Sequence, residues 1–168
     1  MSEIVVLGLG TNKVFGTLSC KDLLKEACRA LSFVLDDIKE SPVYRTKPMY
    51  VNDQPDFFNM VVSGTYEKSA YDLLFEIHKI EESLGRNRAK EIRFGQRSLD
   101  IDIEIFGSQE ICSESLQIPH PRLLERAFVL LPLVDLISEN EVIIPNANKY
   151  ISALSKIGIN GAEKLGEL

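Results

Sequence analysis

Apolar residues in the first part of the chain fall into two patterns, one typical of a strand and one typical of a helix. The apolar run 4–7 stops at residues 8–12, Gly-Leu-Gly-Thr-Asn, which is typical of a buried strand entering a turn. From 20 to 35, apolar residues recur at helical spacing. Ser19 and Asp22 stand before them at the spacing of a capping box, so the sequence predicts a first helix here.

The next pattern predicts two strands followed by a second helix. Stretches 42–46 and 57–63 are rich in β-branched and aromatic residues, and the Pro/Asn/Asp segment between them predicts a loop. Ser69 and Asp72 have the spacing of a second capping box. Behind them the apolar residues of 73–84 repeat at helical spacing, which predicts the second helix.

Residues 99–105 alternate apolar and acidic side chains with period two. This pattern predicts a strand with one core face, and it places Asp100, Asp102 and Glu104 together on the other face. Residues 122–137 are mostly apolar and predict a further helix. The order strand, helix, two strands, helix, strand is that of the ferredoxin-like α+β fold, in which we expect helices on one face of an antiparallel sheet.

Composition indicates the general class of protein. With 168 residues, 45% hydrophobic and 26% charged, the chain fits a single globular domain over residues 1–168. No apolar run approaches the roughly 20 residues of a membrane-spanning helix, and the N-terminus is acidic where a signal peptide is basic. The three cysteines form no C-x-x-C pattern, which argues against a disulfide framework or a zinc site. We therefore expect a soluble, cytoplasmic protein without a membrane partner.

Positive charge is concentrated in one segment. The net charge is −6, but residues 86–97 carry five basic side chains against Glu91 alone, a local +4 that leaves −10 on the rest of the chain. An acidic protein with one basic segment argues against a broad nucleic-acid surface. It favours a compact anionic ligand bound at one place.

Asp100 and Asp102 form a candidate metal site. On a strand, their side chains lie on one face with Cα atoms about 6.5 to 7 Å apart. Such hard oxygen ligands suit Mg²⁺, which takes one or two carboxylates and completes its shell with water and substrate phosphates. The alternative is a solvated strand face that binds no metal.

Four arginines just before this strand form a candidate phosphate site: Arg86, Arg88, Arg93 and Arg97. Guanidinium groups bind phosphate oxygens bidentately. Favourable charge at a helix C-terminus would explain Arg86 and Arg88 but not the other two. Carboxylates that hold a metal, beside convergent arginines, are the groups that phosphoryl transfer uses. The sequence has no P-loop and no kinase glycine loop, so ATP would have to bind on another scaffold.

Other candidates are a histidine and a set of aromatic residues. His120 lies between two prolines and could donate a hydrogen bond to a phosphate oxygen, although a lone histidine is more often structural. Phe57, Phe94 and Phe128, with the amide of Asn59, are suited to hold a flat heterocycle. From the residues alone, three such aromatics are more often core.

These residues together make the chain resemble a known family. Segment 93–103, Arg-Phe-Gly-Gln-Arg-Ser-Leu-Asp-Ile-Asp-Ile, is similar to the R-W/F-G-P-R-x-L/I-D-L/I-D-I signature of 6-hydroxymethyl-7,8-dihydropterin pyrophosphokinases. Further similar segments follow the family's order between residues 4 and 137: 10–12, 41–46, 54–59, 80–81, 84–88, 118–122 and 126–130. The resemblance implies that ATP and the hydroxymethyl pterin are the substrates, and that AMP is the leaving group, in a step of folate biosynthesis.

The resemblance also implies a role for each candidate residue. Asp100 and Asp102 would hold two Mg²⁺ ions that bridge the ATP phosphates. Catalytic roles in contact with ATP or the transferring group would fall to these two aspartates and to Arg86, Arg88, Arg93 and Arg97. Further ATP contacts would come from Leu74, Glu81, Ile103, His120 and Arg126. The pterin would be enclosed by Thr46, Phe57, Asn59, Phe94 and Phe128.

Three positions depart from the family pattern. Gln96 replaces the usual proline, Glu104 replaces an apolar residue, and His78 stands where glutamine is common. None removes a proposed metal ligand, so we expect an effect on rate and nucleotide affinity rather than on reaction type. Glu104 is the least expected of the three, since period two places it on the metal face.

Two other functions stay open as alternatives. A ferredoxin-like module could bind a nucleotide or single-stranded RNA without chemistry. Against it, Asp100 and Asp102 would repel phosphate unless a metal intervened. A metal-dependent phosphodiesterase usually uses more histidine or acidic ligands than this chain, with two histidines, provides. We favour the pyrophosphokinase, acting as a monomer on small molecules, without nucleic acid.

Overall fold

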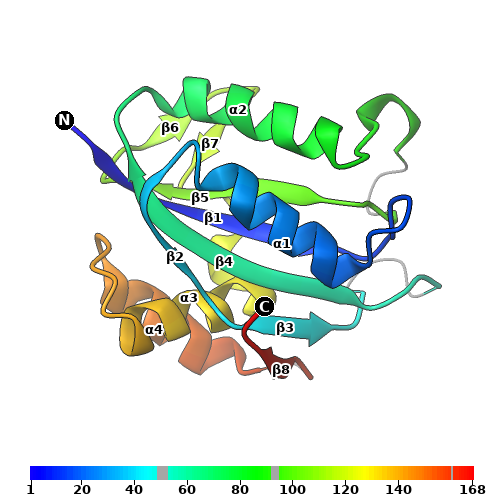
Figure 1. The fold of residues 1–168 in the computed structure, drawn as a ribbon. Coiled ribbons are helices and arrows are strands. Elements are labelled where there is room, and N and C mark those ends of the chain that lie inside the picture. The colour runs from blue at the N-terminus through cyan, green and yellow to red at the C-terminus, as the bar shows by residue number, and fades with distance from the viewer. Residues whose placement is uncertain (49–52, 92–94, 160) are drawn as a thin grey trace.

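An antiparallel sheet forms the centre of the computed structural model, which describes residues 1–48, 53–91, 95–159 and 161–168 (Figure 1). In order across the sheet, the strands are β5 (Asp100–Phe106), β1 (Glu3–Thr11), β4 (Phe57–Tyr66), β3 (Val43–Thr46) and β8 (Glu163–Gly166). A further strand, β2 (Asp36–Glu40), also pairs with β4. β1 lies between β4 and β5, which is the strand order of the ferredoxin-like fold. The predicted α+β class is confirmed.

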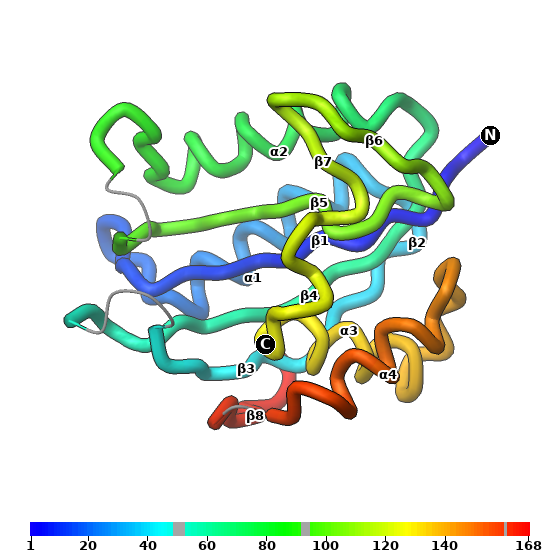
Figure 2. Tube along the Cα trace, turned by 180° about the vertical axis from the view of Figure 1, so that it is seen from behind, coloured from blue at the N-terminus to red at the C-terminus, as the bar shows by residue number. Residues whose placement is uncertain are grey.

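Helices cover both faces of this sheet. On one face lie α1 (Cys20–Leu31) and α2 (Ala70–Ser83), and on the other lie α3 (Ala127–Glu139) and α4 (Ala147–Ile157) (Figures 1 and 2). Successive side chains of β1 point to opposite faces of the sheet, and both faces are apolar. Leu7 packs in one cluster with Leu31 and Ile77, while Val6 packs in another with Leu133. The expectation of helices on one face alone was therefore wrong. Sequence periodicity identifies an apolar stripe but not the face against which it packs.

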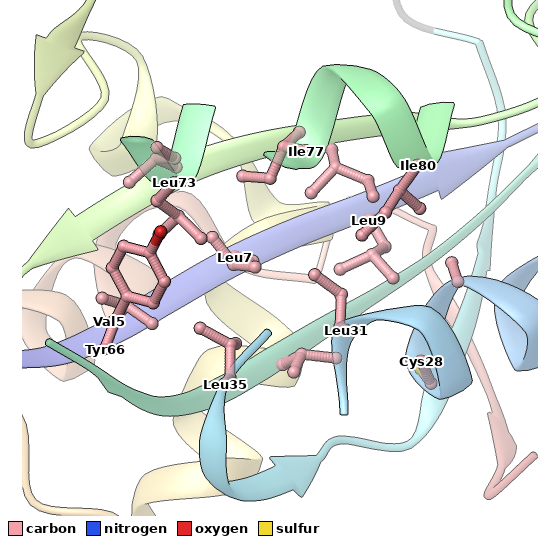
Figure 3. Close-up of a cluster of buried hydrophobic side chains, with 14 of the residues drawn as sticks. Val5, Leu7, Leu9, Cys28, Leu31, Leu35, Tyr66, Leu73, Ile77 and Ile80 are labelled. Carbon is pink, nitrogen blue, oxygen red and sulfur yellow. The ribbon is translucent and has the colours of Figure 1, made fainter. Parts of the chain in front are cut away.

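The face beneath α1 and α2 is a continuous apolar core (Figure 3). Leu7 and Leu9 of β1 meet Leu31 of α1 and Ile77 of α2, and all four are at most 2% exposed. Burying a side chain of this size contributes about 1.5 to 3 kcal/mol. The apolar contacts on this face therefore stabilise the sheet and fill the space beneath α1 and α2. Room for a ligand is left on the opposite face.

Both predicted capping boxes are present. The side chains of Ser19 and Ser69 accept the backbone N–H groups of Asp22 and Asp72, and each aspartate accepts the N–H of its serine in return. These caps fix where α1 and α2 begin. α1 ends at Leu31, four residues before the predicted end.

Several elements were not predicted from the sequence. They include β2, β8, α4 and the short hairpin of β6 (Ile111–Cys112) and β7 (Gln117–Ile118). The predicted helix 122–137 is divided into a 3₁₀ turn, η2 (Leu123–Glu125), followed by α3, and another 3₁₀ turn, η1 (Arg88–Lys90), follows α2. Among the described residues, no helix has the length and apolar character needed to cross a membrane.

Candidate active site

The floor of the candidate site is a pair of glycines on β1, between strands β4 and β5. Gly8 pairs with Asp102 and Gly10 pairs with Asp100 on β5, while Gly10 also pairs with Asn59 on β4. A Cβ atom at Gly10 would lie 3.0 Å from Asn59 Oδ1 and would crowd that amide. The floor therefore joins the carboxylates of β5 to the amide of β4 with no β1 side chain between them.

A cavity of about 560 Å³ opens over this floor. Side chains predicted for the metal, the nucleotide and the pterin all line it: Thr46, Phe57, Asn59, Arg86, Arg88, Arg97, Asp100, Asp102, His120, Arg126 and Phe128. The cavity is also lined by residues that the sequence did not single out as site residues, including Gly8, Gln54, Glu91 and Glu104. Segments far apart in the chain thus form one space.

Three predicted ATP contacts do not line this cavity. Leu74 and Ile103 pack in the apolar core with α2. Glu81 is 1% exposed, and its Oε1 accepts a backbone N–H of β5 at 2.8 Å. Its two carboxylate oxygens also pair with Arg86 and Arg88, so Glu81 orients two of the predicted phosphate ligands.

Asp100 is held between two arginines. Its Oδ1 accepts a hydrogen bond from Arg86 at 2.5 Å, and its Oδ2 accepts one from Arg97 at 2.7 Å. Burial raises the pKa of Asp100, but Arg97 and Arg86 outweigh this effect and hold the pKa below its usual value. Asp100 is therefore ionised at neutral pH. Arg93 and Phe94, the remaining predicted residues of this segment, lie outside the described residues.

Asp102 has less compensating charge. Its Oδ2 accepts a hydrogen bond from Arg126 at 3.3 Å, and burial together with the charge of Asp100 raises its pKa to about 7. A divalent cation would relieve this repulsion. Among the described residues, no three His, Cys, Asp or Glu side chains are grouped to hold a metal. Two carboxylates with positions left for water and phosphate oxygens fit Mg²⁺, which seldom uses an all-protein shell.

His120 directs one ring nitrogen toward the carboxylates. Its Nδ1 accepts the backbone N–H of Arg122 at 3.1 Å, so the neutral ring carries its proton on Nε2. Nε2 lies 3.9 Å from Asp102 Oδ2 and 3.5 Å from Arg126 Nη1. Burial and the charge of Arg126 lower the pKa of His120 to about 4. At neutral pH His120 therefore offers an uncharged N–H donor to this end of the cavity.

Mostly neutral side chains form the other end of the cavity, which Lys47 also lines. Asn59, 5% exposed, donates from Nδ2 to Thr46 Oγ1 at 2.8 Å. The rings of Phe57 and Phe128 line the same cavity. The Arg126 guanidinium lies 5.6 Å from the centroid of the Phe128 ring, so the two ends meet at this pair.

Asn12 supports the site in a way that the sequence did not reveal. It is 3% exposed, and its Oδ1 accepts the backbone N–H of Arg97 at 3.0 Å. Its Nδ2 donates to Gln54 Oε1 at 3.1 Å and to the carbonyl of Pro55 at 3.2 Å. One amide thus joins the arginine segment to the loop before β4. The signals in the sequence are its position after the glycine turn and its place in segment 10–12, which resembles the family.

Comparisons with known proteins identify the family of the chain. A family model described as 7,8-dihydro-6-hydroxymethylpterin-pyrophosphokinase matches residues 6–138. The folate synthesis bifunctional protein of Arabidopsis thaliana is 38% identical over 141 residues, which cover 83% of this chain and 28% of that protein. The 2-amino-4-hydroxy-6-hydroxymethyldihydropteridine pyrophosphokinase of Bacillus subtilis is 41% identical over 103 residues, which cover 61% of this chain and 60% of that protein.

A solved structure shares the fold. Wild-type HPPK-DHPS of Plasmodium falciparum aligns with a TM-score of 0.63 at 17% identity, over 98% of this chain and 48% of that one. The site and fold thus define a ferredoxin-like protein with a cavity lined by arginines and aspartates. On the matched span, the chain belongs to the 7,8-dihydro-6-hydroxymethylpterin-pyrophosphokinase family. It spans 28% of the Arabidopsis relative and 60% of the Bacillus one.

Proposed function

We propose that this protein transfers the terminal diphosphate of ATP to 6-hydroxymethyl-7,8-dihydropterin, a step of folate biosynthesis, and releases AMP. The supporting observation is that one cavity has a charged end at Asp100 and Asp102 and a neutral end at Asn59. A triphosphate fits the first end and a flat, polar ring fits the second. A concave space of this size suits two small substrates better than a nucleic-acid strand.

In this reaction the hydroxymethyl oxygen of the pterin attacks the β-phosphorus of ATP. The bond between that phosphorus and the oxygen bridging to the α-phosphate breaks, AMP leaves with that oxygen, and the hydroxyl proton is released. Arg86 and Arg97 would stabilise charge on the transferring group, and His120 would donate its Nε2–H to a phosphate oxygen. Arg88 and Arg126 would add further positive charge at the same end. No covalent enzyme intermediate is required.

Asp100 and Asp102 would hold Mg²⁺, and we propose two ions. When bound, Mg²⁺ neutralises and orients triphosphate oxygens. The protein's part is to provide both carboxylates on one strand face, each paired with at least one arginine that would also engage the phosphates. Arg93 and Phe94 are proposed to complete the phosphate and pterin ends. Leu74, Glu81 and Ile103 stay proposed nucleotide contacts outside this cavity.

At the neutral end, Asn59 would form hydrogen bonds with the polar edge of the pterin, while Phe57 and Phe128 would pack on the faces of the pterin ring. Asn59 and Thr46 already bond to each other, which fixes the orientation of the amide before a ligand arrives. We also propose that the chain acts as a monomeric single domain in the cytoplasm.

Product analysis tests the proposed reaction. The protein is incubated with ATP, Mg²⁺ and the reduced hydroxymethyl pterin, and nucleotides and pterins are separated by chromatography. We expect AMP to appear in step with the pterin diphosphate. ADP with a pterin monophosphate would contradict diphosphoryl transfer, and nucleotide hydrolysis without a phosphorylated pterin would contradict the proposed acceptor.

A further inference from the structure

Glu104 is a buried acid that the proposed reaction does not yet use. Val6 pairs with Ile105 and Leu7 with Ile103, so Glu104 is the extra residue of a β-bulge in β5. The bulge directs its carboxyl over Gly8, where an added Cβ would lie 2.8 Å from Glu104 Oε1. The missing side chain of Gly8 thus makes room for this carboxyl beside the cavity, which both residues line.

This carboxyl has no hydrogen-bond partner among the described residues. Glu104 is 1% exposed, and both Oε1 and Oε2 are buried and unpaired. A buried acid without a donor is among the most destabilising groups a protein can contain. Such groups persist where a ligand supplies the missing interaction.

Neither His120 nor Arg126 donates a hydrogen bond to Glu104 in this structure. His120 Nδ1 lies 4.0 Å from Glu104 Oε2, but this nitrogen already accepts the N–H of Arg122. The Arg126 guanidinium is directed to Asp102. The His120 ring therefore has one nitrogen near Glu104 and the other near Asp102, and all three side chains line one cavity.

We propose that Glu104 is a positioning residue for the divalent cation at Asp102, and that it accepts a hydrogen bond from a water molecule that the cation retains. This inference rests on the metal site of the proposed function. Contact through water fits the finding that the described acidic and histidine side chains form no direct group of three around a metal. It also fits the preference of Mg²⁺ for keeping several waters. The positive charge of the cation would offset the buried carboxylate.

The test measures cation affinity rather than activity alone. Mn²⁺, a paramagnetic substitute for Mg²⁺, is titrated into the full chain with α,β-methylene-ATP and followed by electron paramagnetic resonance. Glu104→Gln removes the charge at constant size, and Glu104→Leu removes all polarity. We expect both to weaken Mn²⁺ binding by about 10- to 100-fold, as loss of an indirect metal partner typically does. Glu110→Gln, the same change at an exposed position, should leave binding unchanged.

Two further readouts separate this role from a purely structural one. The melting temperature of Glu104→Leu should be equal to or above that of the wild type, because a buried unpaired acid is removed. The Mg²⁺ concentration for half-maximal turnover should rise by the factor seen for Mn²⁺, while turnover at saturating Mg²⁺ stays near the wild-type value. Mn²⁺ affinity within twofold of wild type in both variants would overturn the role of Glu104. Absence of Mn²⁺ binding in the wild type would overturn the metal site itself, and with it this inference.

Discussion

The two ends of the cavity use different chemistry, although they share one sheet. At the β5 end, Asp100 and Asp102 lie among three arginines, and each carboxylate has at least one ion pair. At the β4 end, Asn59 bonds to the neutral hydroxyl of Thr46, and the rings of Phe57 and Phe128 line the same cavity. Asp100 and Asn59 flank Gly10 on its two neighbouring strands, so roughly two strand spacings, about 10 Å, separate the ends.

This difference shows how one small cavity can hold two unlike ligands. In the proposed function, the charged side chains would hold a polyanion and its metal but would not discriminate an uncharged ring. The neutral end would instead recognise the shape of the ring and its hydrogen-bonding edges. Because the glycines of β1 leave the floor between the ends open, the reacting groups can meet there.

The largest effect is expected at the charged end. Asp102→Asn keeps the size of the side chain but removes a charge that offsets the cation. We expect turnover at saturating ATP to fall by at least about 100- to 1,000-fold, the typical effect of losing one electrostatic contact to the transition state. The assay is AMP production with Mg²⁺. Asp37→Asn, the same change at an exposed position of β2, is the control.

A smaller but still large effect is expected at Arg97. Arg97→Lys keeps the positive charge but loses the planar guanidinium, which donates from Nη1 to Asp100 Oδ2 and can bind a phosphate bidentately. We expect turnover to fall on the order of 100-fold, with little change in melting temperature. Arg29→Lys, at a residue whose side chain is 71% exposed, is the matched control. Turnover equal to wild type would place Arg97 outside the phosphate site.

At the neutral end, Asn59→Ala should weaken pterin binding without affecting the nucleotide. Leaving the polar edge of the ring unpaired costs about 1 to 3 kcal/mol, or roughly 5- to 150-fold in affinity. Calorimetry in the presence of α,β-methylene-ATP measures this change. Asn140→Ala, at the exposed far end of α3, should bind pterin like the wild type. Equal loss of nucleotide affinity in Asn59→Ala would mean that the two ends are not separate.

The smallest effect concerns stability without metal. Because the pKa of Asp102 is raised to about 7, the folded state favours its neutral form, and the ionised form destabilises the fold above that pH. Asp102→Asn should therefore be more stable than wild type at pH 8 in chelator, by about 1 to 2 kcal/mol after allowing for the 36% exposure of the side chain. This difference in stability should shrink as the pH falls through 7 toward the usual pKa of an aspartate. Urea unfolding at pH 8 and pH 5 measures it, and an equal difference at both pH values would contradict the repulsion.

Much of this arrangement could be predicted from regular patterns. The period-two alternation of β5 placed Asp100 and Asp102 together, and the capping boxes located α1 and α2. The edge strand β2 was missed because its residues are mostly exposed and show no apolar alternation. The helix predicted over 122–137 contains α3, which lies on the face opposite to α1 and α2, since amphipathicity alone does not choose a face.

Long-range contacts of the site could not be predicted. Asn12 joins Gln54 and Arg97, which are 42 and 85 residues away along the chain. The bulge that buries Glu104 over Gly8 depends on the pairing of β5 with β1, and a plain period-two count cannot show it. Such contacts form only when the sheet is assembled, whereas the positions of helices and strands along the chain follow from the local sequence.

Calorimetry on Asp102→Asn and Asn59→Ala, each with Mg²⁺ and α,β-methylene-ATP and then with pterin, tests the division of the cavity into two ends. We expect Asp102→Asn to lose Mg²⁺-dependent nucleotide binding but to bind pterin as the wild type does without nucleotide. That reference is needed because nucleotide and pterin binding can be coupled. We expect Asn59→Ala to show the reverse pattern. If Asp102→Asn keeps both Mg²⁺-dependent nucleotide binding and turnover near wild type, Asp102 is only part of a solvated strand face and the proposed mechanism is wrong.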